Sequence, residues 1–193
     1  MKRKQLIVIG VGAAGFFCAV NAARLNPGLQ VVILEKTSKL LSKVKISGGG
    51  RCNVTHACFS IADIVKKYPR GNFFLKKAFH HFFTNDTIEW FKERGVGLKT
   101  EADGRMFPVT NSSQTIIDCL IKEANKYNVE IRMNMGVHRL IIVNEQSEIN
   151  KRFQLHLDNE IMSADYVCVA CGGYPKILQY NWLQQISHTI ESP

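Results

Sequence analysis

The chain has 193 residues, enough to bury one core of good size, so a single domain is the default expectation. With 46% hydrophobic and 21% charged residues, the composition is that of an ordinary globular protein and excludes a low-complexity chain. No apolar run approaches the ~20 residues of a membrane span, and the apolar run after the basic residues 1–4 is too short for a secretion signal. We therefore predict a cytoplasmic protein.

The net charge is +9 and the isoelectric point is near 9.3. Such a balance suits an anionic ligand, either a small phosphate-bearing molecule or a nucleic acid. Because the lysines are spread along the chain, we favour a solvated basic surface over a nucleic-acid partner. The six cysteines, without a secretion signal, are predicted to be reduced thiols.

The predicted elements begin with a strand at 5–9, a helix at 16–25 and a strand at 29–34, which together form the unit of a parallel sheet. Further helices are predicted at 39–45, 73–83, 85–94, 112–127 and 182–186. Further strands are predicted at 105–108, 129–133, 136–144, 152–157 and 165–170. Alternating apolar residues near 153–157 predict a small antiparallel meander from about 136 to 157. The segment 166–170 is apolar throughout, which predicts a buried strand.

A glycine loop, Gly-Val-Gly-Ala-Ala-Gly at 10–15, follows the first strand and opens the first helix. Gly10 permits the tight turn, Gly12 lets the backbone approach a pyrophosphate, and Gly15 lets the helix pack against the strand. Glu35 lies twenty residues beyond Gly15, at the end of the second strand, where a carboxylate bonds ribose hydroxyls. The pattern predicts a dinucleotide site, and Glu35 argues against a 2′-phosphate there.

Two more glycine-rich segments follow, SGGGRCNVT at 47–55 and VACGG at 169–173. The first concentrates backbone N–H groups and side-chain donors shortly after the ribose-binding strand, although a surface loop would have a similar composition. The second places glycines at the end of a late strand, where a backbone can pass close to a ligand.

In order and spacing, these motifs resemble the bacterial flavoproteins of the YhiN/BaiN (HI0933-like) type, a family of NAD(P)/FAD-dependent oxidoreductases. The matching residues are 10–15, Glu35, 48–55, 104–108 and 170–173. The stretch GGGRCNVT is the specific part of the match. The chain departs from the family at Cys171, where Thr is common, and at 174–182, which is shorter than the glycine-rich segment of many members.

The resemblance implies an α/β, Rossmann-like FAD/NAD(P)-binding fold of the glutathione-reductase type, with a central parallel sheet and a small antiparallel meander. It implies that 1–193 is the first segment of a discontinuous FAD-binding domain, without the inserted domain and closing segment of family members. The full protein would move a hydride through FAD, from NAD(P)H to an unknown small-molecule substrate, and the isolated segment would be inactive. The residues expected to contact FAD are Gly10, Gly12, Ala13, Ala14, Gly15, Glu35, Lys36, Ser47, Gly48, Gly49, Gly50, Arg51, Cys52, Asn53, Val137, Ala170, Cys171 and Gly172.

The cysteines offer other interpretations. Cys52 and Cys58 resemble the redox pair of disulfide reductases, but five residues separate them and the surrounding motif fits the other family better. Cys52, His56 and Cys58 have the chemistry of metal ligands, as does the pair Cys168 and Cys171. Strand residues three apart point to opposite faces, so we predict no metal site.

Two other functions stay open. One is an NAD-using Rossmann enzyme without flavin, and the other is a flavoprotein acting on tRNA, suggested by the net charge of +9. Arg51 is expected either to bond a phosphate or to make structural hydrogen bonds, and Arg105 either to pack against helices or to lie near the cofactor. The aromatic residues of 73–83 are expected to be core or to be covered by the absent domain.

Overall fold

The structure is a computed structural model, which describes residues 3–143, 152–174 and 176–191. It divides into two compact units, one formed by Met1–Ser42 with Leu120–Pro193 and the other by Lys43–Cys119. Each unit has its own sheet or sheets. That 1–193 as a whole is one segment of a discontinuous domain stays a prediction.

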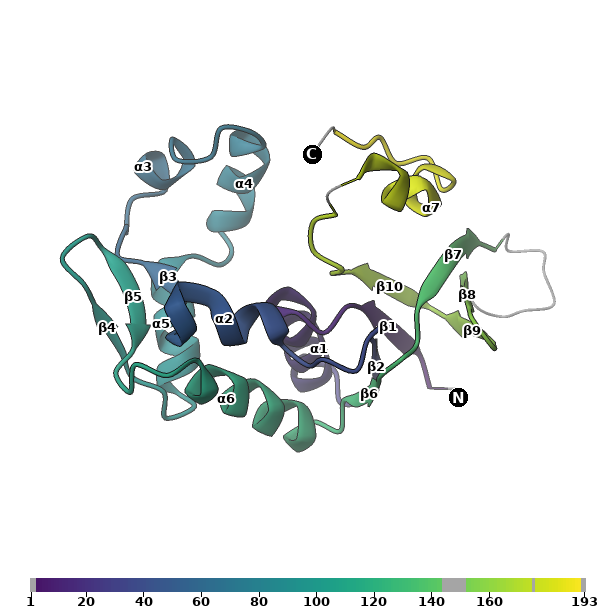
Figure 1. Cartoon of the computed structure of the whole chain (residues 1–193), viewed down its shortest axis with the longest axis horizontal. Helices are drawn as coiled ribbons and strands as arrows, with labels where there is room; N and C mark the ends of the chain where they lie inside the picture. The colour runs from purple at the N-terminus through teal and green to yellow at the C-terminus, as the bar shows by residue number, and fades with distance from the viewer. Residues whose placement is uncertain (1–2, 144–151, 175, 192–193) are drawn as a thin grey trace. The chain divides into compact units, whose positions relative to one another are not determined.

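The first unit is built on a four-stranded parallel sheet (Figure 1). Its strands, in the spatial order β10-β1-β2-β6, are β10 (Tyr166–Val169), β1 (Gln5–Ile9), β2 (Gln30–Leu34) and β6 (Glu130–Arg132). Helix α1 (Ala13–Leu25) connects β1 to β2 and lies against the sheet. The predicted strand, helix and strand are therefore confirmed, with the helix starting three residues earlier than expected.

Helix α1 is apolar on the face that meets the sheet. Its buried positions recur at intervals of three and four residues, at Phe16, Ala19, Val20 and Ala23. Full burial of a Phe or Val side chain contributes about 1.5–3 kcal/mol. The helix ends at Asn26, whose N–H still donates to the carbonyl of Ala22 at 3.0 Å, and Pro27 does not continue it.

The opposite face of the sheet is covered by an antiparallel meander in the order β7-β8-β9. Its strands are β7 (Val137–Ile142), β8 (Phe153–Leu157) and β9 (Ile161–Ala164). Leu155 and Leu157 of β8 alternate into one core with Ile7 and Ile9 of β1, which confirms the predicted meander and its alternation. Strand β9 was not predicted, and residue 144 of the predicted strand 136–144 lies outside the described residues.

Strand β10 corrects the prediction of a fully buried strand. Tyr166 and Val169 are 44% and 40% exposed. In the described part of the chain β10 pairs with β1 alone, so it is an edge strand. Its apolar composition predicted burial on both faces, but an edge position leaves one side of the strand open. After β10, a short 3-10 turn at Ile177–Tyr180 leads into α7 (Asn181–Gln184).

The second unit contains helices and a three-stranded antiparallel sheet in the order β3-β5-β4. Its elements are α2 (Ser42–Gly50), β3 (Thr55–His56), α3 (Ile61–Val65), α4 (Asn72–Phe79), α5 (Thr84–Lys92), β4 (Leu98–Thr100), β5 (Arg105–Pro108) and the first part of α6 (Ser113–Lys126). The predicted strand at 105–108 is present with the same bounds, and the predicted helices are present with bounds shifted by a few residues. Elements α3, β3 and β4 were not predicted. Gly95, at φ +76°, follows α5 as expected of a helix C-cap.

None of the described helices is long and apolar enough to span a membrane.

Candidate functional site

The glycine loop of the first unit is fixed by close backbone contacts. Gly10 has φ +111°, and its N–H donates to the carbonyl of Leu34 at 2.8 Å. A Cβ at Gly10 would lie 2.5 Å from the carbonyl oxygen of Ala170, and one at Gly15 would lie 1.9 Å from that of Gly10. Both positions therefore exclude a side chain, which confirms the tight turn and the close packing of α1 on β1.

Gly12 differs from these two glycines. It is the N-cap of α1 in an extended conformation, with φ −79° and ψ −177°. A Cβ there would meet no described heavy atom within 4 Å. The packing of the described chain therefore does not explain a glycine at this position, but the close approach of a ligand to the backbone would.

The N-terminal turn of α1 provides the chemistry for an anion. The N–H groups of its first residues, Ala13, Ala14 and Gly15, have no carbonyl within the helix to bond, and they lie at the positive end of the helix dipole. No acidic residue stands in this turn, and no described side chain caps Gly12. The arrangement fits the pyrophosphate of a dinucleotide.

Glu35 is held beside this loop. Its carboxylate accepts the backbone N–H of Val11 at 3.3 Å and, on its other oxygen, the N–H and hydroxyl of Thr37 at 2.9 and 2.8 Å. The acid that was predicted to bond a ribose thus shares a hydrogen bond with the phosphate loop. Thr37, which orients that carboxylate, was not anticipated from the sequence.

The third glycine segment adjoins the loop. The N–H of Ala170 donates to the carbonyl of Ile9 at 2.8 Å, so the carboxyl ends of β1 and β10 lie together. Gly172 has φ +74°, as expected of a glycine turn. The backbone from Ala170 to Gly172 therefore lies at the same sheet edge as Gly10.

Tyr174 adds an aromatic ring to this edge that the sequence motifs did not indicate. Its ring centroid is 5.1 Å from the Lys36 ammonium and 4.9 Å from the ring of Tyr180, and its N–H donates to the Tyr180 hydroxyl at 2.5 Å. Burial, a hydrogen bond with Cys171 and the nearby Glu35 charge raise the pKa of Tyr174. The phenol therefore stays protonated at neutral pH.

Val137, also predicted to contact the cofactor, begins β7. Its side chain is half-buried and packs on the core that the meander shares with the parallel sheet. The strand register shifts between Val137 and Arg139. Because the side chain is engaged in the core, a ligand would meet the backbone of this residue.

The second glycine segment, in the second unit, interrupts α2. Ser47 leaves the helical conformation with ψ 146°, and the three glycines that follow adopt positive φ values, +56° at Gly48, +68° at Gly49 and +85° at Gly50. A Cβ at Gly48 would lie 2.7 Å from the ring of Phe107, whereas one at Gly49 would meet no described atom within 4 Å. The predicted break of this helix is confirmed.

Arg51 makes structural contacts within the second unit. Its guanidinium forms an ion pair with Glu101, lies 4.0 Å from the ring centroid of Phe107 and donates to the carbonyl of Gly48 at 3.4 Å. Of the two expected roles, the structural one is observed, and a phosphate at Arg51 would have to compete with Glu101. Arg105 is similarly paired, with Asp103 at 2.7 Å.

Cys52 and Asn53 make contacts within the second unit, Cys52 as a buried residue and Asn53 as an exposed one. Cys52 is buried with φ +63°, and burial raises the pKa of its thiol. A protonated, buried thiol is a poor nucleophile. The Asn53 amide, oriented to satisfy its neighbours, donates to the carbonyls of Thr55 at 2.9 Å and Met106 at 3.3 Å. These side chains therefore shape the segment and leave its backbone to meet a ligand.

All six cysteines are free thiols in this structure. Cys18 of α1 and Cys168 of β10 hydrogen-bond each other, a contact between positions too far apart in the sequence to be predicted from it. This contact lowers the pKa of Cys168 to about 7 and raises that of Cys18. Within 3–143, 152–174 and 176–191 no group of three or more His, Cys, Asp or Glu is placed to hold a metal ion.

A cavity of about 570 Å³ lies elsewhere in the first unit, lined by residues 139–142 of β7 and 185–187. None of the residues predicted to contact a cofactor lines it. Within the first unit we therefore place the candidate site at the glycine loop 10–15, together with Glu35 and Ala170–Gly172.

Comparison with known proteins identifies the family. The model of the HI0933-like protein Rossmann domain matches residues 4–193. The chain belongs to this family. The resemblance drawn from the motifs and the Rossmann-type fold are thus both confirmed, and the family is one of flavoprotein oxidoreductases.

Individual relatives cover most of this chain. A ribosomal RNA dihydrouridine synthase from Escherichia coli (strain K12) is 30% identical over 173 residues, 90% of this chain and 40% of that protein. A 3-dehydro-bile acid delta(4,6)-reductase from Clostridium scindens is 28% identical over 166 residues, 86% of this chain and 38% of that protein. The chain thus spans about two fifths of the length of these curated relatives.

Solved structures share the fold at low identity. THI4 from Thermovibrio ammonificans matches with a TM-score of 0.61 and 13% identity, over 94% of this chain and 62% of that one.

Proposed function

We propose that this chain binds FAD and is part of a flavin-dependent oxidoreductase. The observation that carries the proposal is the geometry at Gly12. The start of α1 has N–H groups without a carbonyl partner inside the helix, and a Cβ at Gly12 would meet no described atom within 4 Å. Glu35 beside the loop provides the ribose partner.

In this proposal the residues of the first unit hold the adenosine diphosphate half of FAD. The N–H groups of Gly12–Gly15 bind the pyrophosphate, Glu35 accepts the ribose hydroxyls, and Ala170–Gly172 offer backbone groups at the same sheet edge. Lys36 adds positive charge, and Val137 contributes its backbone. FAD, when bound, supplies hydride-transfer chemistry, while the protein supplies binding, orientation and electrostatics.

We propose that the segment Ser47–Asn53 of the second unit also contacts FAD, mainly through backbone. The left-handed conformations of Gly48 to Gly50 expose N–H groups without a Cβ to cover them. Arg51 and Asn53 make hydrogen bonds within their own unit, which supports a role in holding the segment in shape.

The proposal of FAD over NAD rests on the family and is tested by titration calorimetry of the purified chain. FAD should bind with a stoichiometry of one, and NADH in the same concentration range should bind far more weakly. Tight binding of NADH without binding of FAD would instead favour an NAD-using Rossmann enzyme.

We further propose that NAD(P)H donates the hydride and that the acceptor of the full protein is a carbon–carbon double bond. The names of the two relatives support this class, because one denotes a reductase of a delta(4,6) bile acid and the other the synthesis of a dihydro form of uridine. Anaerobic mixing of the full-length, FAD-loaded protein with NADH or NADPH should bleach the visible flavin absorbance. A spectrum unchanged by both donors would contradict the assignment of the donor.

A second candidate function is reduction of uridine in RNA. The 30% identity to a ribosomal RNA dihydrouridine synthase and the net charge of +9 favour it. Deleting the gene in its source organism and measuring dihydrouridine in ribosomal RNA by mass spectrometry tests it. Loss of a dihydrouridine supports the RNA substrate, and an unchanged content points to a small molecule.

We also propose a cytoplasmic location. All six cysteines are free thiols, as is usual in a reducing compartment. Cell fractionation with an antibody to the chain tests this, and recovery outside the cytoplasm would contradict it.

A further inference from the structure

A short segment of the second unit carries a large part of the positive charge. Residues 60–82, which we call the α3–α4 surface, contain five Lys or Arg residues and one Asp, a net charge of +4 out of +9 for the whole chain. The basic residues are Lys66, Lys67, Arg70, Lys76 and Lys77. The positive charge is thus more concentrated in this segment than we expected from the spread of lysines along the chain.

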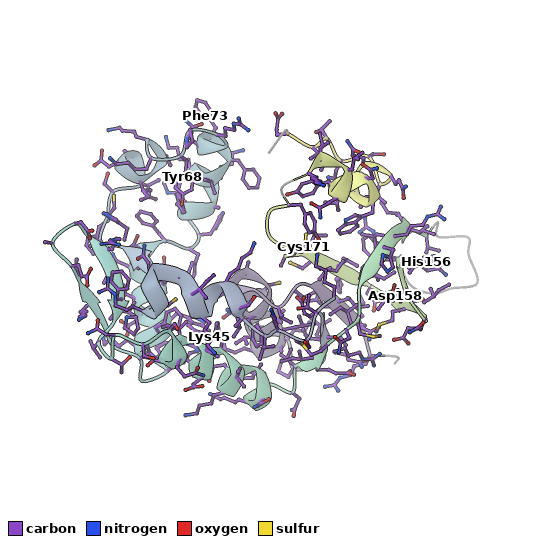
Figure 2. The ribbon with its side chains drawn as sticks, in the orientation of Figure 1. Lys45, Tyr68, Phe73, His156, Asp158 and Cys171 are labelled. Carbon is purple, nitrogen blue, oxygen red and sulfur yellow. The ribbon has the colours of Figure 1, made fainter. Side chains whose placement is uncertain are left out.

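The same surface exposes aromatic rings. Phe73 and Phe74 are 85% and 78% exposed, and Tyr68 is 40% exposed. In Figure 2, Phe73 lies at the outer end of α4 and Tyr68 lies between α3 and α4. The aliphatic side chains of the segment are instead half-buried, namely Ile61, Ile64, Val65 and Leu75. Phenylalanine and the larger aliphatic residues have similar preferences for burial, so that preference does not explain why Phe73 and Phe74 are the exposed ones.

Aromatic and basic side chains occupy neighbouring positions on the surface of α4. Lys76 and Lys77 follow Phe73 by three and four residues, and Lys77 follows Phe74 by three. Residues at these spacings are neighbours on a helix surface. Each exposed ring therefore has a lysine at a neighbouring position of the helix.

The rings that hold this region together are different ones. Tyr68 and Phe79 lie with centroids 5.9 Å apart, and Phe79 and Phe83 lie 5.1 Å apart. The Ser60 hydroxyl caps α3 by accepting the N–H of Asp63 at 3.3 Å. Since Phe73 and Phe74 stand outside these contacts, they can be replaced without removing the support of the two helices.

We propose that the α3–α4 surface binds single-stranded RNA, with bases stacked on Phe73 and Phe74 and phosphates paired with Lys76 and Lys77. The inference rests on the RNA branch of the proposed function. Non-sequence-specific single-strand sites combine these two features, a basic track for the backbone and aromatic rings for successive bases. A net charge of +4 attracts an anionic occupant and would repel a second copy of the same surface.

A lipid surface is a weaker match. Helices that lie on membranes bury aliphatic as well as aromatic residues in the acyl boundary. Here the larger aliphatic residues are half-buried instead of exposed, and α4 has only eight residues. We therefore choose RNA and make vesicles an arm of the test.

The experiment is fluorescence anisotropy of a labelled single-stranded RNA oligonucleotide of mixed sequence, titrated with the 193-residue chain at several salt concentrations. The F73A/F74A variant should lose at least about tenfold in affinity, with the slope of log affinity against log salt unchanged. The K76Q/K77Q variant should lower that slope by about 1.4, as expected for two single-strand phosphate contacts.

Matched controls lie in the first unit and on α6. Leu25 and Leu178 are each 72% exposed, so L25A/L178A removes as many exposed apolar side chains without touching the α3–α4 surface. K122Q/K126Q removes two exposed lysines of α6. Both controls should bind RNA within about twofold of the wild type, and circular dichroism should show all four variants folded.

Unchanged affinity in a folded F73A/F74A variant, or an equal loss in L25A/L178A, would overturn the proposal. So would a Phe-dependent binding to anionic phosphatidylglycerol vesicles, or a Phe-dependent dimer in sedimentation, without a Phe-dependent binding of RNA. The FAD titration is independent of this test. Phe-dependent RNA binding without FAD binding would support the RNA-binding surface and contradict the flavin proposal. FAD binding without Phe-dependent RNA binding would support the flavin proposal and contradict the RNA-binding surface.

Discussion

Glu35 accepts the N–H of Val11 at 3.3 Å, so the acid at the end of β2 and the glycine loop after β1 are joined by a hydrogen bond. The other oxygen of the same carboxylate bonds Thr37. The Glu35 side chain therefore holds the glycine loop, and its own carboxylate is held in one orientation toward a ribose.

The E35Q variant should weaken FAD binding by about tenfold or more, since hydrogen bonds to a charged acceptor contribute about 1.5–3 kcal/mol. Titration of FAD followed by flavin fluorescence measures the loss. E130Q, which alters the Glu130–Arg132 pair on β6, serves as the control and should leave affinity unchanged. An E35Q affinity within twofold of the wild type would contradict the role of this carboxylate.

Gly12 and Gly15 should respond to alanine in different ways. G15A drives a Cβ to 1.9 Å from a backbone oxygen, so unfolding in urea should show at least the roughly 1–3 kcal/mol loss typical of overpacking. G12A meets no described atom within 4 Å, and its loss should stay under about 1 kcal/mol. Equal destabilisation by the two substitutions would show that the packing at Gly15 is misassigned.

The Arg51–Glu101 pair should stabilise the second unit. Its side chains are 34% and 28% exposed, and E101Q should lower the free energy of unfolding by about 1–2 kcal/mol. R51K should not preserve stability, because lysine lacks the planar group that stacks on Phe107.

The exposed Lys92–Glu89 pair, with side chains 69% and 56% exposed, provides the control for that measurement. E89Q should cost under about 0.5 kcal/mol. If E89Q and E101Q destabilise the protein equally, the partial burial of the Arg51–Glu101 pair has no energetic consequence.

Cys168 should be alkylated in a pH-dependent manner. The Cys18 hydrogen bond favours the thiolate and lowers the Cys168 pKa to about 7, so the rate should rise with pH and reach half its plateau near pH 7. In C18A the donor is lost, and the midpoint should move up toward 9.0, the ordinary value for a cysteine. Iodoacetamide labelling with peptide mass spectrometry measures both, and identical midpoints in C18A and wild type would refute the coupling.

Most elements of the first unit were predictable because their signals are local. The apolar run at 5–9, the glycine loop and the alternation in β8 each reflect one strand or helix and its own periodicity. Strand β9 was missed because four residues give too little periodicity, and the edge position of β10 was missed because burial depends on which strand lies next to it.

In the candidate site, the glycines were predictable and their partners were not. The need for a glycine at position 10 or 48 follows from motifs, but the atoms that enforce it belong to Ala170 and Phe107, which are distant in sequence. The same holds for Glu101, whose pairing with Arg51 depends on how the chain returns through β4 and β5. Glu101 lies shortly before the GRMFP segment at 104–108. Its negative charge was the one feature of the sequence that could have suggested a pairing with Arg51.

The central claim is that the glycine loop of α1 holds the pyrophosphate of FAD, and the most direct test is titration calorimetry of FAD into wild type and G12A. The wild type should bind one FAD, and G12A, although folded, should lose at least about tenfold in affinity because its methyl group fills the space that a phosphate needs. Equal FAD affinity in the two proteins, or no binding of FAD by a folded wild type, would contradict the claim.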